Sequence, residues 1–444
     1  MEQIKEITRA EELNKRGIIF IESKQEEEAL KYFNKAIKCD ANYLEPHYNK
    51  AMVYIVSEKF DEAIECYDDI LKKDPKQGEA CFEMANVLFF NKNDIKGAVE
   101  LYNRAIFLGT RNDTIYYYLG LCLEASGDVE DGLKWIERAI RINEKRPELL
   151  LKKAGILTAL GRYIEAEKTY DKVLMLEADN DEAYHFKCII LGEQGKYDEA
   201  FSVLAGGEEL IGKKVIFEYD KSLLFERQMK FAEALAAIEQ GLEIDGDNTL
   251  LLEKKGSLLL LLEKGEDAKD TFDKISELEP ENMEGYFNKG SVCLLMQELD
   301  EALEIFESII EKSNEDNAYR INSYYFKALI LKKLGKDDEA KQAYDFALKN
   351  YNVLILDYPY DAQLQLLKAN TLRDTGSYEK AEEFYEYAID LNKKLPEVYL
   401  NRAKNYILLC RMDDAKKAIQ ATLKLNPGYK AIIDLDEDLK KCLN

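Results

Sequence analysis

The chain has 444 residues, and 86 acidic side chains against 62 basic ones give it a formal net charge of −24. A surface this acidic repels phosphate backbones and anionic lipid, so the composition argues against nucleic-acid binding and against membrane binding. The longest apolar run, residues 258–262, is far too short to span a bilayer, and the charged N-terminus has no apolar signal core.

The cysteines are scattered along the chain and form no C-x-x-C pair. Most of them fall on apolar helix positions, where cysteine behaves as a small hydrophobe. This usage predicts reduced thiols and a cytoplasmic protein. The cysteines are Cys39, Cys66, Cys81, Cys122, Cys188, Cys293, Cys410 and Cys442.

Two-helix units recur along the chain, and residues 283–310 show the pattern most clearly. Spacings of three and four place Gly290 and Cys293 on one face of a first helix, and Ala302 and Phe306 on one face of a second. Most units begin 34 residues after the previous one, with three longer gaps of 35, 38 and 41 residues. The small residue that opens each second helix is Ala29, Ala63, Ala98, Gly132, Ala166, Ala200, Ala234, Ala268, Ala302, Ala340, Ala381 or Ala415.

A period of 34 residues with two helices per unit resembles the tetratricopeptide repeat family, and the resemblance covers almost the whole chain. The eighth position of the unit is small throughout: Gly17, Ala51, Ala85, Gly120, Ala154, Cys188, Ser222, Gly256, Gly290, Ala328, Ala369 and Ala403. The twenty-fourth position is large and apolar throughout: Phe33, Tyr67, Tyr102, Ile136, Tyr170, Leu204, Ile238, Phe272, Phe306, Tyr344, Tyr385 and Ile419.

The resemblance implies an all-α fold, an α-solenoid in which tandem helix-turn-helix hairpins wind into a right-handed superhelix. Each hairpin buries its apolar stripe against the next, so one continuous solenoid of about twelve repeats is expected over residues 1–429. Residues 430–444 are expected to add a C-terminal capping helix, because residues 430–443 read as one amphipathic helix.

Several places depart from the regular repeat. The third unit has one extra residue in its turn, near residues 91–94. Gly206 and Gly207 predict an early end to the sixth unit's second helix. The two longest gaps predict a longer first helix over residues 316–322 and a longer second helix over residues 349–356.

No catalytic constellation is evident. The two histidines, His47 and His185, lie far apart in sequence without cysteine or acid neighbours at metal-ligand spacing, which favours a surface or groove role over a ligand role. No glycine-rich phosphate loop occurs. We therefore expect a protein without enzymatic activity, catalytic residues, metal or cofactor.

The resemblance implies that repeat positions 2, 5, 9, 12 and 13 of the first helices line a concave face. Aromatic and aliphatic residues at these positions predict a peptide groove, with two interpretations left open: a surface for a partner, or residues buried by tight curvature. The predicted groove residues are Tyr48, Phe82, Phe89, Phe90, Tyr117, Tyr219, Phe287 and Tyr325.

A basic residue replaces the family's usual leucine at the seventh position of most units. Its stem can pack while its charged head reaches water. Acids in neighbouring helices are the favoured partners, and an anion-binding stripe is the alternative. The residues are Arg16, Lys50, Lys153, Lys187, Lys221, Lys255, Lys289, Lys327, Lys368 and Arg402.

The predicted function is a scaffold or adaptor that holds a peptide or helix in its groove, as a monomer or a loose homodimer. Residues 276–316 carry twelve acids and two bases, which favours a basic or amphipathic partner. One alternative is a regulatory or targeting subunit of an enzyme complex. A helical-repeat RNA binder is disfavoured by the acidic charge.

Overall fold

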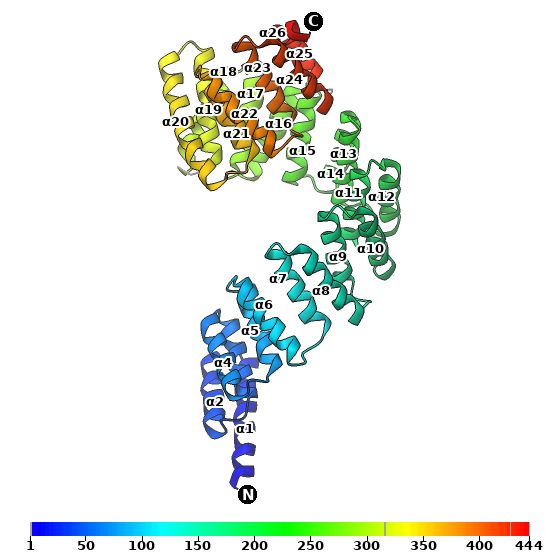
Figure 1. Ribbon diagram of the computed structural model, residues 1–444, viewed down its shortest axis with the longest axis vertical. Helices are drawn as coiled ribbons and strands as arrows, with labels where there is room; N and C mark the ends of the chain where they lie inside the picture. Colours follow the sequence, from blue (N-terminus) through cyan, green and yellow to red (C-terminus); the bar gives the residue numbers. More distant parts are fainter. Residues whose placement is uncertain (1, 315–316, 427, 444) are drawn as a thin grey trace. The chain divides into compact units, whose positions relative to one another are not determined.

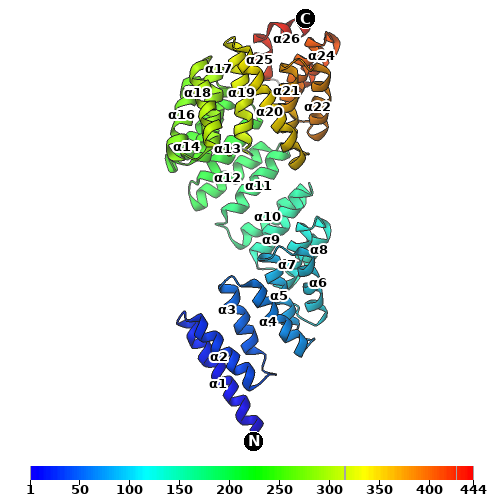
Figure 2. The ribbon, with the colours of Figure 1, turned by 90° about the vertical axis from the view of Figure 1, so that its left-hand side faces the viewer.

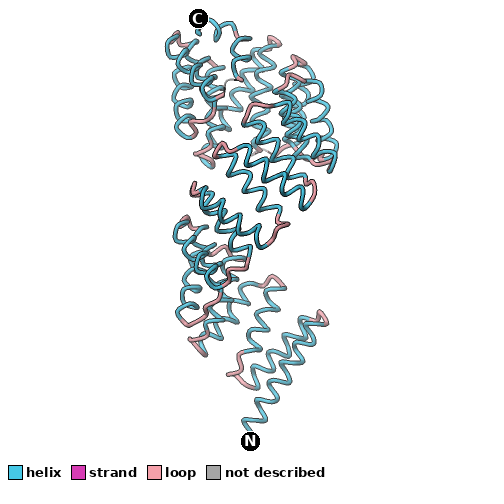
Figure 3. The backbone as a smooth tube through the Cα atoms, turned by 90° about the vertical axis from the view of Figure 1, so that its right-hand side faces the viewer, coloured by secondary structure: helices cyan, strands magenta, loops and turns pink. Residues whose placement is uncertain are grey.

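The computed structural model describes residues 2–314, 317–426 and 428–443, and these residues form α-helices joined by short loops (Figure 3). The predicted all-α class and the solenoid of paired helices are confirmed. Within each unit, consecutive helices pack against each other, both within a hairpin and between hairpins (Figures 1 and 2). In the described part of the chain, no helix is both long enough and apolar enough to cross a membrane.

The chain divides into two compact units, residues 1–213 and residues 214–444. Unit 1 holds six hairpins. Its helices are α1 (Glu2–Glu22), α2 (Glu26–Cys39), α3 (Glu45–Val56), α4 (Phe60–Lys73), α5 (Gly78–Phe90), α6 (Ile95–Phe107), α7 (Asp113–Ala125), α8 (Val129–Ile142), α9 (Pro147–Ala159), α10 (Tyr163–Leu176), α11 (Asp181–Glu193) and α12 (Tyr197–Ile211).

Unit 2 holds six further hairpins and two short terminal helices. Its helices are α13 (Val215–Arg227), α14 (Phe231–Ile244), α15 (Thr249–Leu261), α16 (Gly265–Leu278), α17 (Met283–Leu295), α18 (Leu299–Lys312), α19 (Ala318–Lys333), α20 (Asp337–Asp357), α21 (Ala362–Asp374), α22 (Tyr378–Leu391), α23 (Pro396–Leu408), α24 (Met412–Leu425), α25 (Tyr429–Leu435) and α26 (Glu437–Leu443). The single continuous solenoid over residues 1–429 stays a prediction.

The eighth and twenty-fourth repeat positions meet in the core of each hairpin. A glycine at the eighth position faces phenylalanine or isoleucine, whereas five of the six alanines there face tyrosine. At Gly256 the reason for a glycine opposite phenylalanine is steric, because an added Cβ would lie 2.4 Å from Cζ of Phe272. The phenylalanine ring therefore occupies the space that a methyl group would fill. The two positions set the spacing of the helices together.

The turn inside each hairpin contains one residue in the left-handed conformation. At five turns it is glycine, as at Gly127 with φ of +90° and Gly161 with φ of +71°. At seven other described positions the residue is not glycine, although this conformation costs an L-residue about 1–2 kcal/mol. These residues are Lys24, Glu58, Asn93, Met229, Glu263, Gln297 and Cys410.

The irregular repeats follow the sequence in three cases and depart from it in one. The third unit's extra residue does lie in the turn between α5 and α6, and α19 and α20 are longer than their counterparts, although residues 315–316 lie outside the described part. The expected early end of α12 is wrong, because the helix runs through Gly206 and Gly207. It ends at Gly212, whose φ of +79° breaks the helical conformation.

The C-terminal segment forms two short helices, so the expectation of one helix over residues 430–443 is wrong. The break falls at Asp436, whose Oδ1 accepts hydrogen bonds from the backbone N–H of Asp438 and Leu439. This is the geometry of a helix N-cap, which starts a new helix in place of continuing the old one. Ile433 and Leu439 are fully buried against the last hairpin.

Candidate functional site

Large apolar side chains stay exposed at one repeated place on the first helices, the thirteenth position of the repeat. In unit 1 these are Val56, which is 72% exposed, and Phe90, which is 55% exposed. In unit 2 they are Leu261, Leu295 and Leu408. We call the surface formed by repeat positions 2, 5, 9, 12 and 13 of the first helices the first-helix face. A contiguous patch of exposed apolar side chains is typical of an interaction surface.

An aromatic cluster lies on this face between α5 and α7. The rings of Phe89 and Phe90 are 4.8 Å apart, and Phe90 meets Tyr118 edge-on at 5.0 Å. Phe82 stacks on Tyr118 at 6.3 Å but is itself buried. The sequence predicted three of these residues and missed Tyr118, which occupies the sixth repeat position. Three consecutive tyrosines, residues 116–118, were the available signal.

The other predicted residues of unit 1 are half-buried. Tyr48 packs edge-on against Tyr67, with ring centroids 6.0 Å apart. Tyr117 lies beneath the guanidinium of Arg146, 5.6 Å from its ring centroid. Burial raises the pKa of Tyr117, so its hydroxyl stays protonated. Each of these two tyrosine rings is therefore partly exposed on the first-helix face and partly packed against a neighbouring side chain.

The predicted residues of unit 2 are less accessible. Tyr219 and Phe287 are half-buried, and Phe287 packs between Phe306 at 5.6 Å and Phe326 at 5.3 Å. Tyr325 is only 5% exposed, and its hydroxyl donates a 3.0 Å hydrogen bond to Asp374. Tyr325 therefore belongs to the core, as Phe82 does in unit 1, and neither ring offers a free face to a partner.

Six of the basic residues at the seventh position pair with acids of neighbouring second helices. Lys187 lies 2.5 Å from Asp171, and in four further hairpins the partner is likewise the acid at the twenty-fifth position of the preceding repeat. Arg402 pairs with Glu382, and Lys368 lies 3.7 Å from the ring centroid of Phe384. These contacts support the interpretation of a structural ladder between hairpins.

Cys293, Glu298 and Glu301 form a cluster of the kind that can hold a metal ion. The ammonium of Lys269 occupies it, 2.8 Å from Glu298 and 2.7 Å from Glu301. Hydrogen bonding to Lys269 lowers the pKa of Glu298, and burial raises the pKa of Cys293 to about 11. The thiol is therefore protonated, and the cation that the carboxylates bind comes from the chain itself.

His47 is not on the surface or in the groove as expected, because it is only 5% exposed at the fourth position of its repeat. It faces the second helix of its hairpin, where Lys73 lies beside it. His185 is half-buried on α11, and its ring is 4.8 Å from that of Phe186.

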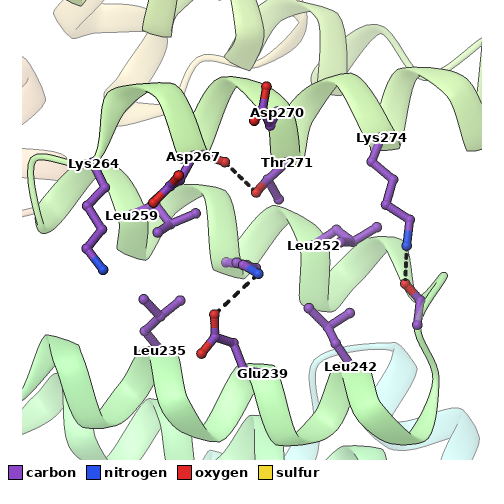
Figure 4. Close-up of a pocket in the computed structure, with 12 residues that line it drawn as sticks. Leu235, Glu239, Leu242, Leu252, Leu259, Lys264, Asp267, Asp270, Thr271 and Lys274 are labelled. Carbon is purple, nitrogen blue, oxygen red and sulfur yellow. Dashed lines mark hydrogen bonds and ion pairs between the residues drawn. The ribbon is translucent and has the colours of Figure 1, made fainter.

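A cavity of about 630 Å³ lies in unit 2 between α14 and α16, above α15 (Figure 4). Thr271 lies at the twenty-third repeat position, where some other hairpins carry a larger residue such as Trp135 or Phe384. Leucines of α14 and α15 line it, and three of them, Leu235, Leu252 and Leu259, are almost fully buried, whereas Leu242 is half-buried. Lys255 pairs with Glu239 at 3.3 Å and Lys274 donates to the Gly246 carbonyl at 2.7 Å. The cavity therefore offers little uncovered apolar surface.

The acidic segment 276–316 is partly neutralised within the fold. Glu298 and Glu301 bind Lys269, and Glu307 pairs with Lys327 at 2.7 Å. Its last two residues, 315 and 316, lie outside the described part of the chain. The pairing reduces the field that this segment presents to a basic partner.

Comparison with known proteins identifies the repeats. Models of the tetratricopeptide repeat match residues 20–86, 88–147, 147–180, 253–317, 327–396 and 372–435. The TPR repeat-containing protein MJ1428 of Methanocaldococcus jannaschii is 26% identical over 201 residues. That match spans 41% of this chain and 35% of the relative, so the chain corresponds to about a third of it.

Solved structures of tetratricopeptide repeat proteins resemble the chain at low identity. Yeast Tom70 is 17% identical with a TM-score of 0.45, over 98% of this chain and 96% of that one. YrrB, a protein with an unusual peptide-binding site, is 21% identical with a TM-score of 0.38, over 43% of this chain and 97% of that one. Because the repeat models together match more than half of the sequence, this chain belongs to the tetratricopeptide repeat family.

Proposed function

We propose that the protein is a non-enzymatic scaffold that binds a peptide or helix of another protein on its first-helix face. One observation carries the proposal: large apolar side chains recur uncovered at the thirteenth repeat position in both units, from Val56 and Phe90 to Leu295. Their burial by a partner would release bound water from the apolar surface of each unit, and each large side chain buried contributes about 1.5–3 kcal/mol. Aromatic anchors such as Phe90 lose little rotamer freedom on binding.

The alternative is a regulatory or targeting subunit whose enzymatic partner is another chain. The same face would serve that role, so the two proposals differ in what is bound and not in where. A helical-repeat RNA binder is less well supported, because a net charge of −24 opposes contact with phosphate.

We infer a cytoplasmic location from the chemistry of the thiols. Six of the cysteines are buried, and burial raises the pKa of Cys66 to about 11 and that of Cys122 to about 12. Such thiols stay protonated and act as small apolar groups in the core. This usage suits a compartment in which thiols remain reduced.

Site-specific photo-crosslinking tests the proposed face. p-Benzoylphenylalanine in place of Phe90 is expected to capture a polypeptide from an extract of the source cell. The captured protein is then purified and its binding to the wild-type chain measured. The same probe in place of Phe107 provides the control, because Phe107 is 86% exposed but lies at the end of a second helix. Equal capture at both positions, or no capture at Phe90, would contradict the proposal.

A further inference from the structure

A cavity of about 350 Å³ lies on the first-helix face of unit 1, where α7, α9, α10 and α11 meet. It adjoins the aromatic cluster around Phe90, because the ring centroids of Tyr117 and Tyr118 are 5.7 Å apart, and it lies entirely within unit 1. Its lining combines aromatic, aliphatic and charged side chains: Tyr117, Glu148, Leu151, Lys152, Gly155, Tyr170, Glu182 and Phe186.

Gly155 creates this cavity. It occupies the ninth repeat position on α9, and a Cβ added there would meet no atom within 4 Å. In the other first helices of unit 1 the same position mostly carries a larger side chain, such as Met52 on α3, Leu121 on α7 or Ile189 on α11. The missing side chain leaves a space of the width that a ligand side chain would need.

The walls of the cavity are apolar and aromatic. Tyr170 and Phe186 stack on each other with ring centroids 6.2 Å apart and planes inclined by 16°. Leu151 and the half-buried ring of Tyr117 complete the lining. Such walls suit a methylene chain, and the faces of the rings attract a cation.

The basic and the acidic side chains around the cavity differ in how far they are already paired within the chain. The bases are already bound to acids of the chain: Lys152 lies 2.6 Å from Glu124, and Arg146 lies 3.0 Å from Asp113. Glu148 is 3.5 Å from Arg146, but its side chain stays 64% exposed. Burial raises the pKa of Tyr170, and the nearby carboxylate of Glu182 acts in the same direction. Carboxylate charge therefore remains available at the cavity while the ammonium and guanidinium groups are neutralised.

The rest of the first-helix face of unit 1 is also acidic. In five of the six hairpins of unit 1 the second repeat position is glutamate, namely Glu11, Glu45, Glu79, Glu148 and Glu182. No lysine or arginine stands at any of the first-helix-face positions of unit 1. A ligand lying along this face meets apolar side chains flanked by carboxylates, which complements a basic amphipathic segment.

We propose that the cavity at Gly155 receives a lysine or arginine side chain of a polypeptide that lies along the first-helix face of unit 1. The inference rests on the proposed function and names the chemistry of the ligand. The methylenes of the ligand side chain contact Leu151 and Phe186. The charged end pairs with the carboxylates of Glu148 and Glu182.

Fluorescence anisotropy with defined peptides tests the inference. The probe is a labelled amphipathic peptide of leucine and lysine, and the comparison peptides carry glutamine or glutamate in place of every lysine. The full-length wild-type chain should prefer the lysine peptide. Gly155→Leu should fill the cavity and weaken that binding by about tenfold. It should not unfold the chain, because the space is open and leucine favours a helix more than glycine does.

Gly206→Leu is the matched control. Gly206 is also an exposed helical glycine of unit 1 with no atom within 4 Å of an added Cβ, but it lies on the second helix α12. The Gly206→Leu variant should therefore bind the lysine peptide as the wild-type chain does. A double variant, Glu148→Gln with Glu182→Gln, should weaken binding more than Glu62→Gln with Glu65→Gln, which removes the same charge from the exposed side of α4.

Three results would overturn the inference: no peptide binds, the lysine and glutamine peptides bind equally, or Gly155→Leu and Gly206→Leu behave alike. None of these results decides the proposed function, because crosslinking at Phe90 does not depend on a cationic side chain or on this cavity. A crosslink at Phe90 together with unchanged binding by Gly155→Leu would show that the face binds a partner without the cavity.

Discussion

The Nζ of Lys73, at the end of α4, lies 2.5 Å from the Nε2 of His47 on α3. Burial and the neighbouring ammonium lower the pKa of His47 to about 4, from an ordinary value of 6.5. Burial also lowers the pKa of Lys73. The imidazole is therefore neutral in the folded chain, and its Nε2 accepts a hydrogen bond from the lysine.

This contact predicts a pH-dependent loss of stability. Below 6.5 the unfolded chain protonates His47 while the folded chain does not, so the unfolded state binds more protons. The free energy of unfolding should therefore fall as the pH decreases from 6.5 towards 4. His47→Gln removes this contribution, which amounts to at most about 3 kcal/mol. Urea unfolding of both proteins across this range measures the difference.

Lys73→Met provides the control for that experiment. Removing the ammonium should raise the pKa of His47 and so reduce the pH dependence, without removing the histidine. If wild type and His47→Gln lose stability in parallel as the pH falls, the buried neutral state of His47 is not what the acid disrupts.

The ladder of basic residues should stabilise mainly through its aliphatic stems. The Lys187 side chain is 16% exposed and Asp171 is 41% exposed, so solvent screens the ion pair. Lys187→Met keeps the stem and should lower stability by less than about 1 kcal/mol. Lys187→Ala also removes buried methylenes, each contributing about 0.8 kcal/mol, and should cost more. Thermal unfolding of the two variants distinguishes the contributions, and equal losses would assign the effect to the charge.

Glycine-to-alanine changes should have opposite effects at two helical sites. Gly155→Ala meets open space and should stabilise the chain by about 0.5–1 kcal/mol, because alanine favours the helix. Gly256→Ala places a methyl group against the buried ring of Phe272 and should destabilise the chain by about 1–3 kcal/mol. Melting temperatures measured under the same conditions test both signs. A stabilised Gly256→Ala would show that the ring moves aside freely.

The C-terminal helices should stabilise the last hairpin. Ile433 is fully buried with Ile419 and Leu400, whereas its neighbour Ile432 is 48% exposed. Ile433→Ser should lower stability by about 3 kcal/mol, through lost apolar contacts and a buried hydroxyl. Ile432→Ser should have little effect. Ending the chain at Gly428 should promote aggregation, which light scattering on heating measures. Equal behaviour of the two serine variants would mean that α25 does not pack as described.

The hairpins, their turns and their contacting faces follow from the sequence, because the spacing of small and large residues repeats with the period of the structure. A small residue at the eighth position and a large one at the twenty-fourth can meet only when two helices pack antiparallel, so the pairs Gly256–Phe272 and Ala85–Tyr102 specify the hairpin locally. The long α20 was predictable for the same reason, since two added turns keep the apolar stripe in phase.

Only the tertiary structure decided which groove residues are accessible. Phe82 and Tyr117 occupy the same repeat position, yet Phe82 is buried and Tyr117 is half-buried. Phe82 packs against Tyr102 and Tyr118, whereas Tyr117 packs against Tyr118 and the guanidinium of Arg146. Periodicity identifies the face of a helix, but burial depends on the side chains that neighbouring hairpins place over it. The ammonium of Lys269 between two glutamates and the open space at Gly155 arise in the same way, from residues that pack together only when adjacent repeats stack.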